Sequence, residues 1–63
     1  MPSALECLEQ AAKSRHSAAR AYRLAATVNG ADAARLQSYG DKLLTEASQL
    51  ERQAAALGSG SLG

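Results

Sequence analysis

The chain has 63 residues and is poor in the residue types that usually stabilise or activate a small protein. Its one cysteine excludes an intrachain disulfide, and one histidine beside it makes a poor metal set. The absence of Trp and Phe, with only two Tyr, disfavours a β-sheet. No apolar run reaches the roughly 18 residues of a membrane-spanning helix. A chain this short is marginal as a monomer, so we expect it to oligomerise.

Charge is nearly balanced. Seven basic and six acidic residues give a net charge of +1, so the chain as a whole has no long-range attraction to nucleic acid or to an anionic membrane. The opening segment MPSALECLEQ lacks the basic and apolar parts of a secretion signal. We therefore expect a soluble, cytoplasmic protein, in agreement with the free cysteine.

Alanine and leucine are abundant, and both favour helix. Ser3 and Glu6 have the spacing of a capping box, which predicts a first helix over residues 3–28. Asn29 and Gly30 can adopt left-handed conformations and end it within a turn at residues 29–31.

A second helix is predicted over residues 32–57, with Asp32 as its N-cap and Asn29 as the competing cap. Two long helices joined by so short a turn must lie antiparallel. The predicted fold class is therefore an all-α, two-helix hairpin over residues 1–57, and the residues 58–63, GSGSLG, have the composition of a flexible tail.

Rows of small residues and leucines repeat every seven residues and predict the contact between the helices. Gly40 belongs to the small-residue row of the second helix, and a mid-helix glycine needs a packing reason. Cys7 belongs to the matching row of the first helix and is expected to pack as a small hydrophobe. The rows are Leu36, Leu43, Leu50 and Leu57; Ala33, Gly40, Ala47 and Ala54; and Ala4, Ala11, Ala18 and Ala25.

The first helix has more apolar surface than one partner helix covers. A second stripe beside the alanine row predicts a further contact, most simply with a second hairpin in an antiparallel four-helix bundle. Arg15 falls inside this stripe, so we expect its side chain to reach out to water or to pair across the interface with Glu46 or Glu51. The predicted interface residues are Leu5, Leu8, Ala12, Arg15, Ala19, Tyr22 and Ala26.

A basic stripe is predicted on the same helix, formed by Lys13, His16, Arg20 and Arg23. Cations at this spacing can track phosphates, so RNA or DNA binding is an alternative function. The stripe is also the face opposite the core, where Glu6 and Glu9 continue it, and this position favours a solvated surface.

No arrangement of residues indicates catalysis. His16 has no nucleophile or carboxylate at helical spacing, and no phosphate-binding loop or nucleophile elbow is present. Asp41 is expected to face outward, and Glu46 and Glu51 to border the apolar face, so the acidic residues predict no metal site. We expect a non-enzymatic chain without catalytic residues, metal or cofactor.

Residues 21–54, AYRLAATVNGADAARLQSYGDKLLTEASQLERQA, combine a Tyr-Arg-Leu-Ala segment, an Asp-containing turn and a Leu/Ala helix. In this they resemble short uncharacterised helical-hairpin proteins of proteobacteria, which implies a bacterial hairpin and no particular activity. The size and the turn Gly-Ala-Asp-Ala at residues 30–33 resemble those of type III secretion needle co-chaperones. The size and the small-residue heptads also resemble those of repressor-of-primer bundles, which implies RNA binding through the basic stripe.

The expected function is a protein–protein interaction or assembly module that forms a homodimer or binds a helical partner. A dimeric RNA- or DNA-binding bundle and a small secretion co-chaperone are the alternatives.

Overall fold

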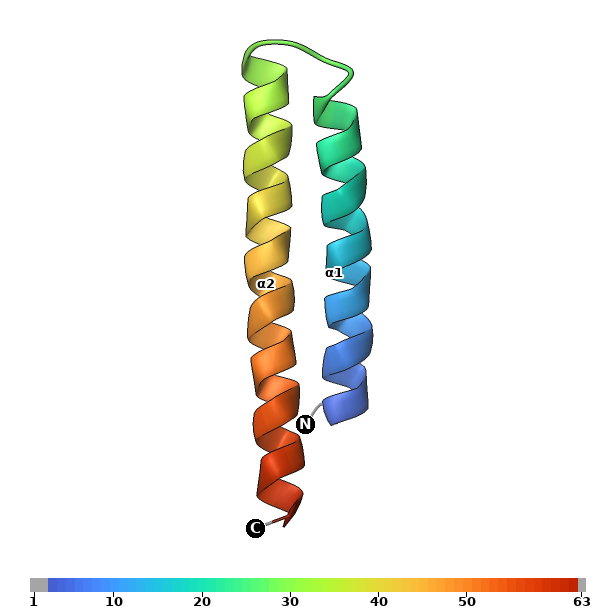
Figure 1. The fold of residues 1–63 in the computed structure, drawn as a ribbon, viewed down its shortest axis with the longest axis vertical. Helices are drawn as coiled ribbons and strands as arrows, with labels where there is room; N and C mark the ends of the chain where they lie inside the picture. Colours follow the sequence, from blue (N-terminus) through green and yellow to red (C-terminus); the bar gives the residue numbers. More distant parts are fainter. Residues whose placement is uncertain (1–2, 63) are drawn as a thin grey trace.

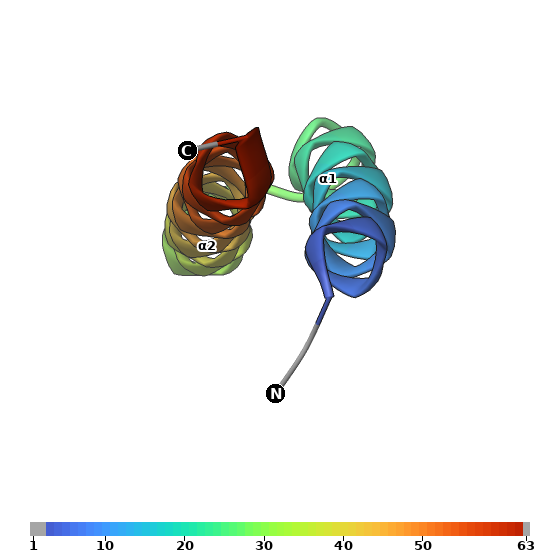
Figure 2. The same ribbon diagram turned by 90° about the horizontal axis from the view of Figure 1, so that it is seen from below.

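The computed structural model describes residues 3–62, which form two antiparallel helices lying side by side (Figures 1 and 2). Helix α1 runs over Ala4–Ala25 and helix α2 over Ala31–Leu62. The hairpin measures 50 × 15 × 13 Å, so each helix has one face against its neighbour and the rest at the surface. The predicted all-α hairpin is confirmed.

Helix α1 begins as the sequence predicts and ends three residues earlier than the predicted Val28. The Ser3 hydroxyl accepts a hydrogen bond from the Glu6 amide at 3.2 Å, which is the N-cap half of the capping box. At the other end both the amide and the hydroxyl of Thr27 donate to the Leu24 carbonyl, at 3.0 and 2.7 Å. They take the acceptor that the amide of Val28 needs to continue the helix, so the helix stops at Ala25.

The connection between the helices depends on Gly30. It has a φ of +64°, the one positive φ among the described residues, and its carbonyl accepts from the Ala34 amide at 3.2 Å. Helix α2 therefore starts at Ala31, directly after the glycine. The predictions of Asp32 or Asn29 as N-cap are wrong; Asp32 lies inside the first turn, where its charge still favours the helix N-terminus.

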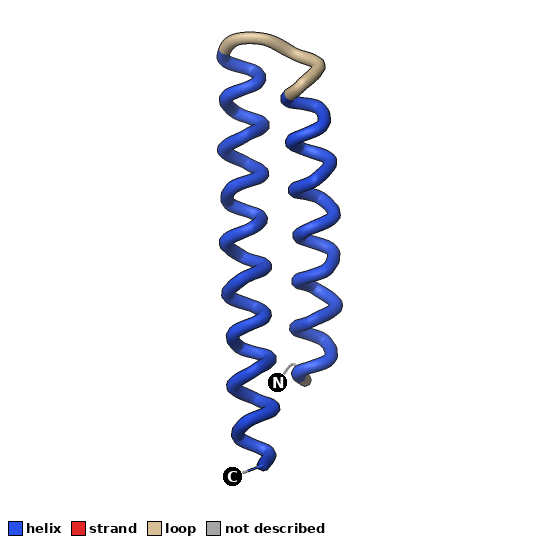
Figure 3. The backbone as a smooth tube through the Cα atoms, viewed as in Figure 1, coloured by secondary structure: helices blue, strands red, loops and turns tan. Residues whose placement is uncertain are grey.

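Helix α2 continues past its predicted end at Leu57 as far as Leu62 (Figure 3). Glycine and serine lower helix propensity without breaking the backbone hydrogen-bond pattern, and no proline follows Leu57 to stop it. The helical backbone thus includes most of the segment predicted as a flexible tail, and residue 63 lies outside the described residues. The end of α2 projects beyond the start of α1 (Figure 1).

The core of the hairpin consists of small side chains. Cys7 is 1% exposed, as expected of a packed thiol, and Ala18 and Ala47 are fully buried. Gly40 is buried too, whereas Leu36, Leu43 and Leu50 are only half-buried. The predicted rows are therefore at the contact, but alanines fill it while the leucines extend out of it. The buried apolar residues of the two helices are Cys7, Ala11, Ala18, Ala21, Ala25, Ala47 and Ala54.

Candidate interaction surfaces

The leucines that the core leaves out lie on two opposite sides of the hairpin. At 100° per residue, Arg15 and Leu24 project to opposite sides of the buried row of α1. We name each side after one residue. The Arg15 face consists of Leu5, Leu8, Ala12, Arg15, Ala19 and Ala26. The Tyr39 face consists of Leu24, Leu36, Tyr39, Leu43, Leu50 and Leu57.

The Arg15 face is the stripe that the sequence predicts, and most of it is exposed. Leu5 and Leu8 are 65% and 48% exposed, and Ala12, Ala19 and Ala26 are exposed as well. The seventh predicted interface residue, Tyr22, is half-buried within the hairpin and does not belong to this exposed surface.

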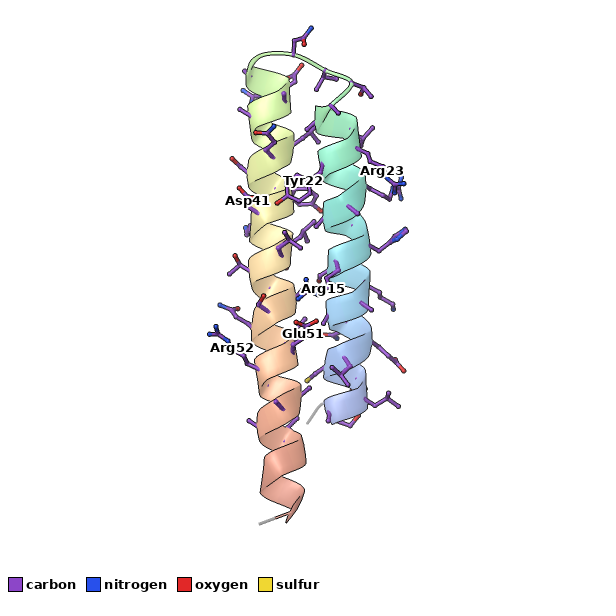
Figure 4. The ribbon with its side chains drawn as sticks, viewed as in Figure 1. Arg15, Tyr22, Arg23, Asp41, Glu51 and Arg52 are labelled. Atoms are coloured by element: carbon purple, nitrogen blue, oxygen red, sulfur yellow. The ribbon has the colours of Figure 1, made fainter. Side chains whose placement is uncertain are left out.

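An ion pair crosses the Arg15 face. Arg15 donates from Nε and Nη2 to the two carboxylate oxygens of Glu51, at 2.8 and 2.6 Å, and Figure 4 shows the two side chains meeting between the helices. These hydrogen bonds lower the pKa of the Glu51 carboxyl and raise that of Arg15, and the opposite charges act in the same direction. The prediction of a pair across an intermolecular interface is corrected here: Glu51 is the partner, but it belongs to the same chain.

Tyr22 makes a second side-chain contact between the helices, about two turns along α1 from Arg15. An added Cβ on Gly40 would lie 2.9 Å from Cε1 and Cζ of its ring, so the ring occupies the space that the glycine leaves. The Tyr22 hydroxyl donates a hydrogen bond to Asp41, which raises the pKa of the phenol, and partial desolvation adds to the rise. The predicted packing reason for Gly40 is confirmed. Glycine lets the ring reach across α2, so Tyr22, which is predicted to face a second hairpin, packs against its own chain. Asp41 is exposed, as predicted, and the Tyr22 hydroxyl reaches it there.

The Tyr39 face contains a shallow hollow of about 210 Å³ near the turn. Leu24 and Tyr39 at its wall are 52% and 55% exposed, and Arg20 lies at its rim. Its lining residues are Ser17, Arg20, Ala21, Leu24, Leu36 and Tyr39. This face is not among the interfaces that the sequence predicts, because the heptad spacing places the leucine row of α2 at the contact with α1. Leu24 and Tyr39 belong to none of the predicted rows, and both lie on the same side as the leucine row. Two large apolar residues in these positions are the feature of the sequence that indicates the Tyr39 face.

The basic stripe lies on the outer side of α1. All four of its residues, Lys13, His16, Arg20 and Arg23, are exposed, and Arg23 points away from α2 in Figure 4. None of them takes part in an ion pair within residues 3–58, where Arg15 and Glu51 form the one salt bridge. Their charges are therefore available to an external group.

Other kinds of site are not found in the part of the chain that the structure describes. Within it, no three His, Cys, Asp or Glu side chains come together in a way that would hold a metal ion. Neither described helix combines the length and the hydrophobicity needed to cross a membrane. Comparisons of the chain with protein-family models, with curated proteins and with solved structures found no match. Function has therefore to be inferred from the two apolar faces and the basic stripe.

Proposed function

We propose that the chain is a non-enzymatic assembly module, a helical hairpin that associates with a second copy to form an antiparallel four-helix bundle. The observation that supports this proposal is that the core contains small side chains while large apolar side chains lie at the surface. The buried residues are alanines and one cysteine, whereas Leu5, Leu8, Leu24 and Tyr39 are about half exposed or more. Large side chains normally fill the core of a small domain, and here a further layer is needed to cover them.

The energetics favour association. Full burial of a leucine side chain contributes about 1.5–3 kcal/mol, while alanine contacts contribute little each. A hairpin of this length buries little apolar surface, so as an isolated monomer it has only marginal stability. Covering one row of leucines therefore adds a large fraction of the stability that the isolated hairpin lacks.

Sedimentation and native mass measurement over a range of concentrations test the proposal. We expect a dimer at micromolar concentration, with a melting temperature that rises with concentration because folding and association are linked. A well-folded monomer with a concentration-independent melting temperature would exclude self-association. A helical partner of another sequence, as in a co-chaperone, would then be sought by pull-down.

Nucleic-acid binding is the second candidate, and it is favoured by one observation, the exposure of all four residues of the basic stripe, three of which are Lys or Arg. A phosphate-tracking site weakens steeply with salt, so titration with labelled RNA at low and moderate salt is the test. Replacing both Arg20 and Arg23 by glutamate should abolish binding, while Arg52→Glu, an exposed charge on α2, serves as the control. Binding that does not depend on salt, or that survives the double replacement, would exclude this function.

A further inference from the structure

We propose that the Tyr39 face, and not the Arg15 face, is the surface that binds the second copy, and that the two hairpins pack with their turns at opposite ends. This inference rests on the proposed self-association and specifies its site. It is argued from the character of the two faces, from the size of the hairpin and from the distribution of charge.

The two faces differ in the charged side chains that would lose contact with water if a second copy covered them. The middle of the Arg15 face carries the Arg15–Glu51 pair, whose side chains are 46% and 40% exposed. Covering this pair removes water from two charges, and the cost can exceed the attraction between them. The middle of the Tyr39 face instead carries Leu43 and Leu50, which are already half-buried, beside a single exposed carboxylate of α2, Glu46. Apolar surface can be covered there without burying an ion pair.

The leucine row of this face is complementary to itself. Leu36, Leu43, Leu50 and Leu57 repeat every seven residues, so a two-fold axis between Leu43 and Leu50 places each leucine opposite one of the second copy. Leu36 then lies opposite Leu57, and Leu43 opposite Leu50. A closed dimer requires such a self-complementary patch. The hollow beside Leu24 and Leu36 lies at the end where Leu57 of the second copy arrives.

The size of the hairpin is sufficient. Its broad side measures 50 by 15 Å. The area of a rectangle of this size is comparable with the roughly 800 Å² that each partner contributes to a stable interface. One broad side therefore accommodates one second copy along its whole length.

Charge selects the orientation. Arg20, Arg35 and Lys42 are exposed on the turn half of the Tyr39 face, and Asp32, five helical turns before Leu50, is an exposed acid there, so this half keeps a net positive charge. Glu6 precedes Leu24 by about five full helical turns, so it projects to the same side at the opposite end. Packing with the turns at opposite ends brings Glu6 near the basic end of the second copy. Packing with the turns together would place the basic ends against each other.

This orientation brings like charges together at the two-fold axis, Glu46 on α2 and Lys13 at the same level of α1, and the pair of Glu46 side chains makes it testable. Glu46 is exposed on the same side of α2 and lies next to the two-fold axis, so the two copies of Glu46 approach each other. Removing this charge should strengthen the dimer. In the other orientation Glu46 lies opposite Lys13 of the second copy, and the same change should weaken it.

The experiment compares variants of matched exposure by sedimentation, with circular dichroism to verify that each is helical. Tyr39 is 55% and Leu8 48% exposed. We expect Tyr39→Glu to raise the dimer dissociation constant at least about ten-fold and Leu8→Glu to change it less than about two-fold. If Leu8→Glu dissociates the dimer and Tyr39→Glu does not, the chosen face is wrong although self-association stands. If the unmodified chain is a monomer, the proposed function itself fails.

A cross-linking measurement fixes the axis independently of stability. In a Cys7→Ala background, Glu46→Cys should oxidise to a disulfide-linked dimer, because the two-fold axis brings this position next to its own copy. Arg35→Cys, on the same face but far from the axis, should stay monomeric on a denaturing gel. Cross-linking of Arg35→Cys without that of Glu46→Cys, or a weaker dimer in Glu46→Gln, would overturn the proposed orientation.

Discussion

Replacing Gly40 by alanine measures how firmly Tyr22 is held against α2. In an open helical position this substitution stabilises a protein by about 1 kcal/mol. At Gly40 the new Cβ would lie 2.9 Å from two atoms of the Tyr22 ring, closer than such contacts normally occur. Overpacking of this kind costs roughly 1–3 kcal/mol. We expect Gly40→Ala to lower the free energy of unfolding by about 1 kcal/mol, a sign opposite to that of an ordinary glycine replacement.

Removing the ring should reverse the sign. In a Tyr22→Ala background nothing obstructs the new methyl group, so Gly40→Ala should stabilise by about 1 kcal/mol. The four proteins form a double-mutant cycle whose coupling reports the contact between the two positions. Urea unfolding followed by circular dichroism, at one fixed chain concentration, gives the four free energies, since association would otherwise shift them.

Gly58 provides a matched control on the same helix. A Cβ added there would meet no atom within 4 Å, so Gly58→Ala should stabilise or be neutral whether or not Tyr22 is present. Equal stabilisation by Gly40→Ala with and without the tyrosine would refute the reasoning, because it would show that the ring moves aside at no cost.

The other predictions concern the ion pair, the phenol and the turn. The folded state lowers the pKa of Glu51, so the Arg15–Glu51 pair stabilises the fold at pH values above the ordinary glutamate pKa, about 4.3, and this contribution is lost as pH falls through the folded value. The free energy of unfolding between about pH 6 and pH 2 should therefore depend less on pH in Glu51→Gln. The pKa of Tyr22 is raised, so its contribution is complete below the ordinary tyrosine value, about 10, and is lost as pH rises through the folded one. Tyr22→Phe should remove that alkaline loss, and a loss that persists would contradict the assignment. Gly30 has a φ of +64°, so Gly30→Ala should destabilise by about 1–2 kcal/mol in thermal unfolding, and an unchanged melting temperature would show that the turn relaxes.

The hairpin was predictable because a period of seven residues and a glycine-containing turn leave few alternatives for so short a chain. The same signals place Gly40 and Cys7 at the contact. Helix ends were less predictable, because they depend on competition for single hydrogen bonds. The Thr27 hydroxyl and amide take the Leu24 carbonyl, and a strong N-cap residue such as Asp32 does not act as the cap once Gly30 has made the turn.

The contacts of Arg15 and Tyr22 could not be read from periodicity. A helical wheel gives the direction in which a side chain leaves its own helix, but both residues leave at the edge of the hairpin. From there a long side chain can reach an external partner or turn back to the neighbouring helix. Carboxylates at Glu51 and Asp41, and the space above Gly40, decide in favour of the second course.

Periodicity also does not give the side on which the leucines of α2 leave the contact. A leucine opposite an alanine across a close helix pair is longer than the gap, so its end must leave the contact on one side. On a helix of 3.6 residues per turn, a row with a seven-residue repeat drifts about 20° per repeat. The leucines of α2 therefore turn progressively from the contact toward the side that carries Leu24 and Tyr39. A row that one wheel assigns to the hairpin contact is thereby divided between that contact and the Tyr39 face, where a second hairpin can complete its burial.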